Sequence, residues 1–151
     1  MKEQVLSPIE PLPPHPHPHP PPHPRPRLLV VEDSVFIVMA LESVCEALGW
    51  EMVGPATNVE SGVALAKAGN QDVALLDVTL EGQACWPVAA ELKARGIPFA
   101  FATGHDLSRT LPAEFAGVPV LQKPFRMADL EQLLPKMLAA ELLALPKGDA
   151  P

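Results

Sequence analysis

Polar side chains suited to chemistry follow four short apolar runs of this 151-residue sequence. In chain order they are the carboxylates of Glu32, Asp33 and Asp77, the hydroxyl of Thr103 and the ammonium group of Lys123. Carboxylate oxygens bind hard cations, whereas a hydroxyl and an ammonium group can donate to the oxygens of a group that arrives beside them. The set therefore indicates a site for a cation and an oxygen-rich anion.

Electrostatics gives the reason to expect the cation. Two carboxylates about 4 Å apart repel each other by roughly 4 kcal/mol at an effective dielectric constant near 20, and a third adds to this cost. A few oxygen ligands with room for water suit Mg²⁺, which usually takes one or two carboxylates together with phosphate oxygens. We therefore expect Mg²⁺ at Glu32, Asp33 and Asp77, and a phosphoryl group beside Asp77.

The elements that position these residues alternate between two patterns. Short apolar runs predict five strands, at residues 28–31, 52–53, 73–76, 99–102 and 118–121. Helical spacing predicts helices at residues 35–48, 59–68, 88–95 and 127–145, and a weak helix at 107–115. Because the weak helix contains Pro112, it should be short or broken.

Strands that are apolar throughout are buried on both faces, and strands that alternate with helices are joined by right-handed crossovers. We therefore expect an α/β fold with a five-stranded parallel sheet, doubly wound as (βα)5. Ligands bind such a sheet beyond the carboxyl ends of its strands. All the strands except the second end at a candidate residue, so the fold should bring the candidates to one edge of the sheet.

At these residues the chain resembles the receiver (CheY-like) domain of two-component response regulators. The resemblance rests on the acidic pair Glu32-Asp33, on Asp77 at the end of VALLD, on Thr103 in FATG and on Lys123 in KPF. It covers residues 27–145, which we take as one receiver domain. It implies a flavodoxin-like, CheY-like topology.

The resemblance also implies a set of metal ligands. Asp33 would ligate Mg²⁺ directly, and Glu32 would act mainly through a bound water. Asp77 and the backbone carbonyl of Thr79 would complete the protein ligands.

For the phosphoryl group, the resemblance implies that Asp77 accepts it from a histidine kinase or a phosphotransfer protein. Lys123, joined to Pro124 by a cis peptide, would pair with the phosphoryl oxygens. Thr103 would move inward to bond them, which is the switch.

The chain departs from the usual receiver pattern at Val120, where many receivers carry an aromatic residue that turns inward with the threonine. Together with FATG, this resembles a subgroup of stand-alone, single-domain receivers that lack the aromatic residue. The route by which the signal leaves the site is then open. His105, two residues after Thr103, would tune the access of water to the phosphoryl group or would be an ordinary exposed loop residue.

Each residue also has a simpler interpretation. Glu32 and Asp33 could merely favour the following helix through its dipole, an effect worth about 0.3 to 1 kcal/mol. Asp77 could be a turn cap, Thr103 an ordinary strand residue and Lys123 a solvated charge. The arrangement of all five at strand ends favours the site.

Composition limits the partners. A net charge of −7 argues against binding to nucleic acid through its phosphates. The sequence has no run of 18 apolar residues and no secretory signal, so we expect a cytoplasmic protein that binds proteins and not a membrane. Cys45 and Cys85 are 40 residues apart in the sequence, which predicts two reduced thiols.

Both ends of the chain differ from the domain between them. Residues 1–26 are rich in proline and histidine and predict a disordered, extended tail that serves as a spacer or a docking segment. Residues 146–151 predict a second disordered tail. Pro135 should kink or split the last helix, whose surplus leucines (Leu142, Leu143 and Leu145) predict a homodimer or partner contact.

We expect a stand-alone phosphoacceptor that binds a downstream protein when phosphorylated, or that drains phosphoryl groups from a kinase. It would catalyse only its own phosphorylation and dephosphorylation, and would not be a metabolic enzyme. The alternative is a phosphorylation-independent interaction module with the same fold. A Mg²⁺-dependent phosphohydrolase would need a second acid-base carboxylate, and Glu81, four residues after Asp77, lies in a short loop without a substrate-enclosing insertion.

Overall fold

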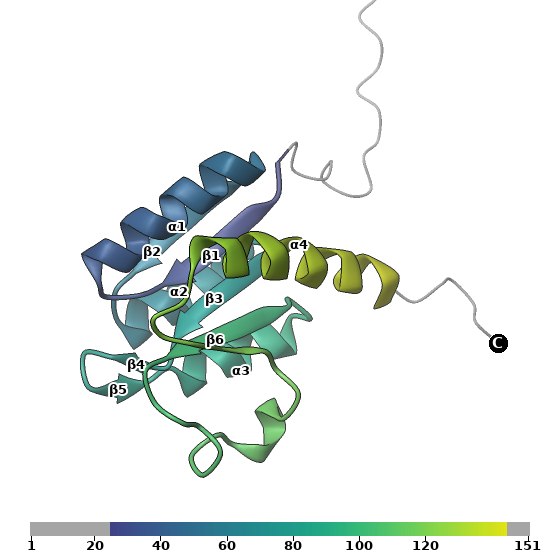
Figure 1. Cartoon of the computed structure of the whole chain (residues 1–151). Helices are drawn as coiled ribbons and strands as arrows, with labels where there is room; N and C mark the ends of the chain where they lie inside the picture. Colours follow the sequence, from purple (N-terminus) through teal and green to yellow (C-terminus); the bar gives the residue numbers. More distant parts are fainter. Residues whose placement is uncertain (1–24, 145–151) are drawn as a thin grey trace, which may run out of the picture.

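The computed structural model describes residues 25–144, and their side chains up to residue 140. These residues form a parallel sheet between two layers of helices (Figure 1). Its strands, in spatial order, are β2 (Glu51–Ala56), β1 (Arg27–Val31), β3 (Val73–Asp77), β6 (Phe99–Thr103) and β7 (Val120–Gln122). The five-stranded parallel sheet expected from the sequence is confirmed.

The helices divide between the two faces of the sheet. They are α1 (Val35–Leu48), α2 (Val59–Ala68), α3 (Trp86–Ala94) and α4 (Met127–Ala144). Helices α1 and α4 pack against each other on one face, and α2 and α3 do so on the other. The sheet is therefore covered on both sides, as a doubly wound fold requires.

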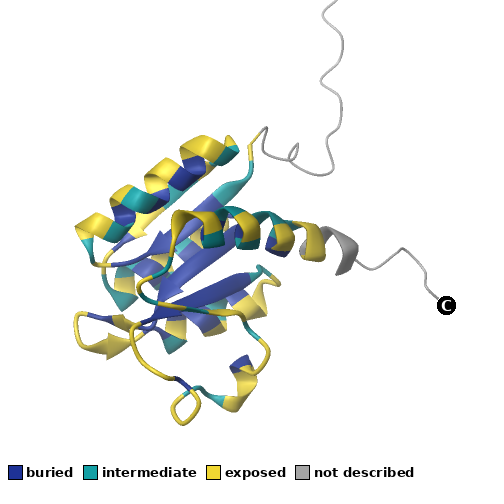
Figure 2. Ribbon diagram, in the orientation of Figure 1, coloured by how far each residue is buried: buried dark blue, intermediate teal, exposed yellow. Residues whose placement is uncertain are grey.

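The central strands are buried on both faces because helices cover each of them. Every residue of β3 and of β6 is buried, and Figure 2 shows these strands in dark blue between the helical layers. In β1, Leu29 and Val31 point to the side of α2 and α3, whereas Leu28 and Val30 point to the side of α1 and α4. Burying each such side chain stabilises the fold by roughly 1.5 to 3 kcal/mol.

Helix caps fix where α1 and α2 begin. The Ile37 backbone N–H donates to Ser34 Oγ over 3.5 Å, and the Ser61 N–H donates to Asn58 Oδ1 over 2.8 Å. Gly49 ends α1 in the left-handed conformation, with φ of 73°. These signals are local, and both helices begin and end where the sequence predicted. The acidic pair that precedes Ser34 is thereby held at the edge of the sheet.

The connection between β6 and β7 differs from the other crossovers. All of its residues are described, and in place of the weak helix predicted at 107–115 it contains a short 3₁₀ helix, η1 (Ala113–Phe115). Pro112 precedes η1 and has no N–H to donate, and it also disfavours helical geometry in Leu111. Leu107 and Phe115 are buried and anchor the segment to the core.

Two further differences concern β-structure and α4. A small antiparallel hairpin, β4 (Thr79–Leu80) with β5 (Gln83–Ala84), follows β3 and was not predicted. Pro135 lies inside α4 without dividing it into two helices.

The predicted tails lie mostly or wholly outside the described residues, and Leu142, Leu143 and Leu145 lie beyond the described side chains. The predicted dimer contact therefore stays a prediction. Among the described residues, no helix is long and apolar enough to span a membrane.

Candidate functional site

Three carboxylates meet at the carboxyl edge of the sheet. Glu32 and Asp33 follow β1, and Asp77 is the last residue of β3, the neighbouring strand. One oxygen of each carboxylate lies within 4.8 Å of the others. Glu32 and Asp77 are buried, whereas Asp33 is exposed, so the cluster is open to solvent on one side.

Lys123 completes this cluster from the end of the edge strand β7. It follows β7, where its backbone N–H donates to the Thr103 carbonyl over 2.7 Å. Its ammonium nitrogen Nζ lies 3.2 Å from Glu32 Oε2 and 3.4 Å from Asp77 Oδ2. A single positive charge is therefore shared by two buried carboxylates. Lys123 and Pro124 are joined by a cis peptide, as the resemblance implied.

Burial raises the pKa of both inner carboxyl groups. For Glu32, burial is the main cause, the charge of Asp77 raises the pKa further, and Lys123 acts in the opposite direction. For Asp77, burial again raises the pKa most, while Lys123 and the hydrogen bond from the Thr79 N–H lower it. One lysine thus offsets only part of the cost of keeping these groups ionised.

The donor set fits a hard divalent cation. Three carboxylates and one ammonium group carry a net charge of about −2 when all are ionised, which a divalent ion would neutralise. The exposed side of Asp33 leaves room for waters of the ion. Asp33 Oδ2 also accepts a hydrogen bond from the Glu81 N–H over 3.2 Å, so the carboxylate is oriented.

Thr79 lies in the β4–β5 hairpin, two residues beyond Asp77. Its N–H donates to Asp77 Oδ1 over 3.3 Å, and the hairpin turn at Glu81 and Gly82 has positive φ at both residues. A two-residue turn of this kind matches the twist of the paired strands. The hairpin therefore positions Thr79 and the Glu81 N–H beside the carboxylates. The ligand role of the Thr79 carbonyl stays a prediction.

Thr103 ends β6 at the same edge, but its hydroxyl is directed to the following loop. Thr103 Oγ1 accepts a hydrogen bond from the His105 N–H over 3.0 Å. The threonine is buried, and the His105 side chain is exposed. In this arrangement the hydroxyl holds the loop between β6 and η1.

Sequence reasoning did not find two contributions to the site. One is the Glu81 N–H that orients Asp33, because the sequence pattern gave no hairpin. The other is the direct bond between Lys123 and Glu32, because Glu32 was expected to act through water. In the sequence, Gly82 was the local signal for a turn, and a pattern of only two residues per strand is too short to show the hairpin.

The family model of the response regulator receiver domain matches residues 28–135. The chain therefore belongs to the response regulator receiver domain family. No curated protein matched the sequence.

Among solved structures, the chain is similar to SdrG from Sphingomonas melonis Fr1, with 42% identity over 78% of this chain and 97% of that one and a TM-score of 0.64. It is 27% identical to the response regulator PhyR from Brucella abortus, over 79% of this chain and 50% of that one, with a TM-score of 0.69. The receiver domain of the histidine kinase PA1611 from Pseudomonas aeruginosa PAO1 shares the fold at 22% identity, over 76% of this chain and 98% of that one, with a TM-score of 0.65, and has a magnesium ion coordinated in its active site cleft.

Proposed function

We propose that the protein is a single-domain response regulator that accepts a phosphoryl group on Asp77. The observation that carries the proposal is the shared ammonium group of Lys123, which lies 3.4 Å from Asp77 Oδ2 and 3.2 Å from Glu32 Oε2, in a cluster that also contains the Asp33 carboxylate. This arrangement pairs a nucleophilic carboxylate with the charges that a transferred phosphoryl group needs.

The transfer would need little from the protein except positioning and charge. An Asp77 oxygen forms a bond to phosphorus while the phosphorus–nitrogen bond of a phosphohistidine breaks, and the histidine nitrogen keeps the electron pair. Lys123 then turns from the carboxylates to the phosphoryl oxygens. Asp33, Glu32, Asp77 and the Thr79 carbonyl would hold Mg²⁺, which supplies the positive charge that offsets the transferred group.

A relative supports a phosphoryl group at this site. The BeF3-activated conformation of SdrG from Pseudomonas melonis Fr1 is 41% identical to this chain, over 74% of this chain and 95% of that one, with a TM-score of 0.62. BeF3 has the charge and shape of a phosphoryl group, so it stands in for a phosphorylated aspartate. The same chemistry at Asp77 is the simplest reading of this similarity.

The phosphodonor would dock on the exposed apolar start of α1. Val35, Phe36 and Met39 are 68%, 84% and 58% exposed and lie in the first turns of α1, which is separated from the acidic pair by one residue. Phe36 lines a cavity of about 380 Å³ that also includes Lys123. Large exposed apolar side chains are typical of protein contacts. A histidine kinase or a phosphotransfer protein that covers this patch would place its phosphohistidine next to Asp77.

The signal would leave through the loop that follows Thr103. If the hydroxyl turns to the phosphoryl group, the His105 N–H loses its partner. His105 and Val120 line a groove of about 470 Å³ on the side of η1, and Val120 is 42% exposed. A downstream protein that reads this groove needs no aromatic residue at Val120. If no downstream protein binds this groove, the chain would serve as a sink for phosphoryl groups.

Intact mass measurement after incubation with Mg²⁺ and acetyl phosphate tests the proposal. We expect one phosphoryl adduct, which is lost in Asp77→Asn and kept in the matched control Asp129→Asn in α4. If neither acetyl phosphate nor a cognate kinase gives the adduct, the protein is a phosphorylation-independent interaction module. Turnover of a small phosphate ester beyond one equivalent would instead indicate a phosphohydrolase.

A further inference from the structure

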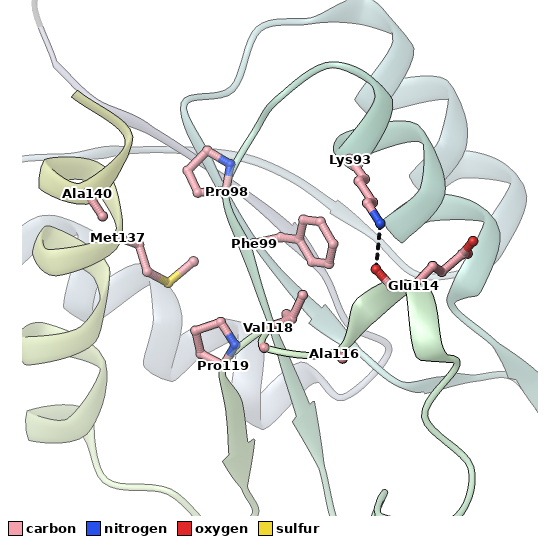
Figure 3. Close-up of a pocket in the computed structure, with 10 residues that line it drawn as sticks. Lys93, Pro98, Phe99, Glu114, Ala116, Val118, Pro119, Met137 and Ala140 are labelled. Atoms are coloured by element: carbon pink, nitrogen blue, oxygen red, sulfur yellow. Dashed lines mark hydrogen bonds between the residues drawn. The ribbon is translucent and has the colours of Figure 1, made fainter. Parts of the chain in front are cut away.

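An apolar cavity lies at the end of the sheet opposite the candidate site. Figure 3 shows it between α4, which contributes Met137 and Ala140, and the starts of β6 and β7, which contribute Pro98, Phe99, Val118 and Pro119. Its volume is about 530 Å³. None of its lining residues belongs to the phosphoacceptor site.

Two charged residues, Lys93 and Glu114, lie at the rim of the cavity, and the ammonium group of Lys93 already has a partner in the domain. Lys93 Nζ donates to the Glu114 carbonyl over 2.6 Å, drawn as a dashed line in Figure 3, and lies 6.0 Å from the ring centroid of Phe115. Its ammonium group therefore does not need an anionic ligand to be satisfied. Apart from Lys93 and Glu114 the lining is hydrocarbon and proline rings, so the occupant should be mainly apolar.

The chain itself supplies such an occupant, because the proline-rich segment enters the domain at the same edge of the sheet. The carbonyl of Arg27, at the start of β1, accepts from the Asp72 N–H over 2.8 Å. On the other side of β3, the carbonyl of Pro98 accepts from the Ala74 N–H over 3.0 Å. The start of β1 and the wall of the cavity are thus two strand spacings apart, about 10 Å.

The segment 18–24 has the length and the pattern to bridge this distance. Polyproline II rises about 3.1 Å per residue with three residues per turn, so seven residues span about 19 Å. Pro18, Pro21 and Pro24 would then lie on one face of the helix. Proline-rich helices bind in apolar, aromatic-lined grooves and lose little conformational entropy when they do so.

We propose that the proline-rich segment 18–24 binds in the cavity of its own domain, with Pro18, Pro21 and Pro24 against Phe99, Pro119 and Met137. The short connection through Arg25 and Pro26 gives the segment a high effective concentration at the cavity, which favours it over a second copy or another protein. Its binding covers the apolar surface at this end of the sheet and leaves the α1 patch free. The proposal does not depend on phosphorylation of Asp77.

A spin label on the segment tests this in the full-length protein. His19→Cys places the label off the predicted proline face. The two native thiols are buried, and burial raises the pKa of Cys45 to about 11 and that of Cys85 to about 12, so both react slowly at pH 7. The readout is broadening of isotope-labelled methionine methyl groups in the NMR spectrum.

Met52 is the internal reference for this measurement. Met52 lies in β2 and pairs with Leu28 of β1, and β2 is next to β1 on the side away from the cavity. A segment without a docking site would therefore broaden the Met52 signal at least as much as the Met137 signal. We expect broadening of Met137 to exceed that of Met52 at least threefold. Equal broadening would overturn the proposal.

Three variants and one mixture test the assignment further. Replacing Pro18, Pro21 and Pro24 together by serine should remove the preference for Met137, whereas the matched replacement of Pro16, Pro20 and Pro22 should keep most of it. The exposed Ala140→Glu should also remove it by placing a carboxylate at the cavity.

In an equimolar mixture, one chain carries the spin label and the other carries only the isotope label. We expect no broadening of Met137 on the second chain. Broadening there would show binding between copies and would overturn the assignment to the same chain. Persistence of the Met137 preference in Ala140→Glu would overturn the assignment to this cavity.

Discussion

The ammonium nitrogen of Lys123 lies 3.2 Å from Glu32 Oε2, although the two residues are 91 positions apart in the sequence. Lys123 follows the edge strand β7, and Glu32 follows β1, with β3 and β6 between them. The lysine side chain therefore crosses the carboxyl edge of the sheet. Its charge links the start of the domain to its last strand.

Lys123→Met is expected to destabilise the metal-free protein at pH 7 by about 1 to 3 kcal/mol. The variant leaves Glu32 and Asp77 buried together without their positive partner, and uncompensated buried charges are costly. Chemical denaturation measures the change. Lys67→Met in α2 removes an exposed lysine away from this site and should change the free energy of unfolding by less than about 0.5 kcal/mol. Equal effects of the two substitutions would show that the lysine is merely solvated.

Asp77→Asn is expected to stabilise the metal-free protein at pH 7. The folded state raises the pKa of Asp77 above its ordinary value of 3.8, so ionising the group costs free energy of folding. The protonated Asp77 of wild type makes its full contribution to the free energy of unfolding below pH 3.8. This contribution is lost as the pH rises through the raised pKa of Asp77 in the folded state. The variant should therefore match wild type near pH 3.5 and melt a few degrees higher at pH 7. A lower melting temperature of the variant at pH 7 would contradict the assigned cause.

Mg²⁺ should raise the melting temperature at pH 7 and lose this effect as the pH falls toward 4, because protonated carboxyl groups do not bind the ion. At a free concentration 100 times its dissociation constant, the ion adds about 2.7 kcal/mol to the free energy of unfolding. Asp33→Asn should abolish the shift, since Asp33 is the exposed carboxylate of the cluster. Asp106→Asn, in the exposed loop after β6, should keep it.

The sequence was sufficient for the parts of the fold that depend on local signals. Ser34 and Gly49 bound α1, and apolar runs mark the strands, because caps and burial act at short range. The carboxyl ends of parallel strands meet at one edge, so the approach of Asp77 to Glu32 followed from topology alone.

Parts of the site that depend on three-dimensional packing could not be predicted. The contact of Lys123 with Glu32 requires the strand order and the length of one side chain together. The direction of the Thr103 hydroxyl depends on a loop whose weak helical pattern is overridden by Pro112. Of the kink or split expected at Pro135, the split does not occur, because α4 continues through this residue as one helix.

Phe36→Ser should slow phosphotransfer from a cognate histidine kinase about tenfold or more, which corresponds to about 1.4 kcal/mol of lost contact. Phe36 is 84% exposed, so the fold loses little. Phosphorylation by acetyl phosphate should be unchanged, because a small donor needs no docking surface. Met127→Ser, at another exposed apolar residue, should leave both rates near wild type. Equal loss with both donors would place Phe36 in the chemistry instead.

Thr103→Val should leave the phosphorylation of Asp77 possible but prevent it from changing the loop that follows Thr103. Valine keeps the shape of threonine but cannot accept the hydrogen bond that the His105 N–H now gives to Thr103 Oγ1 over 3.0 Å. The His105 amide should therefore exchange with solvent roughly fivefold faster in the variant, as expected for the loss of a bond worth about 1 kcal/mol. Hydrogen exchange followed by NMR measures the change.

In wild type, the BeF3 complex should speed exchange at His105 by a similar factor, because the hydroxyl turns to the phosphoryl position. Thr103→Ser keeps the hydroxyl and should behave as wild type in both states, whereas Thr103→Val should show no further change on BeF3 binding. Since Val120 offers no aromatic ring to move with the threonine, the proposed output route predicts that the release of His105 is the first change at the groove that a downstream protein would contact. Unchanged exchange at His105 in the wild-type complex would rule out this route.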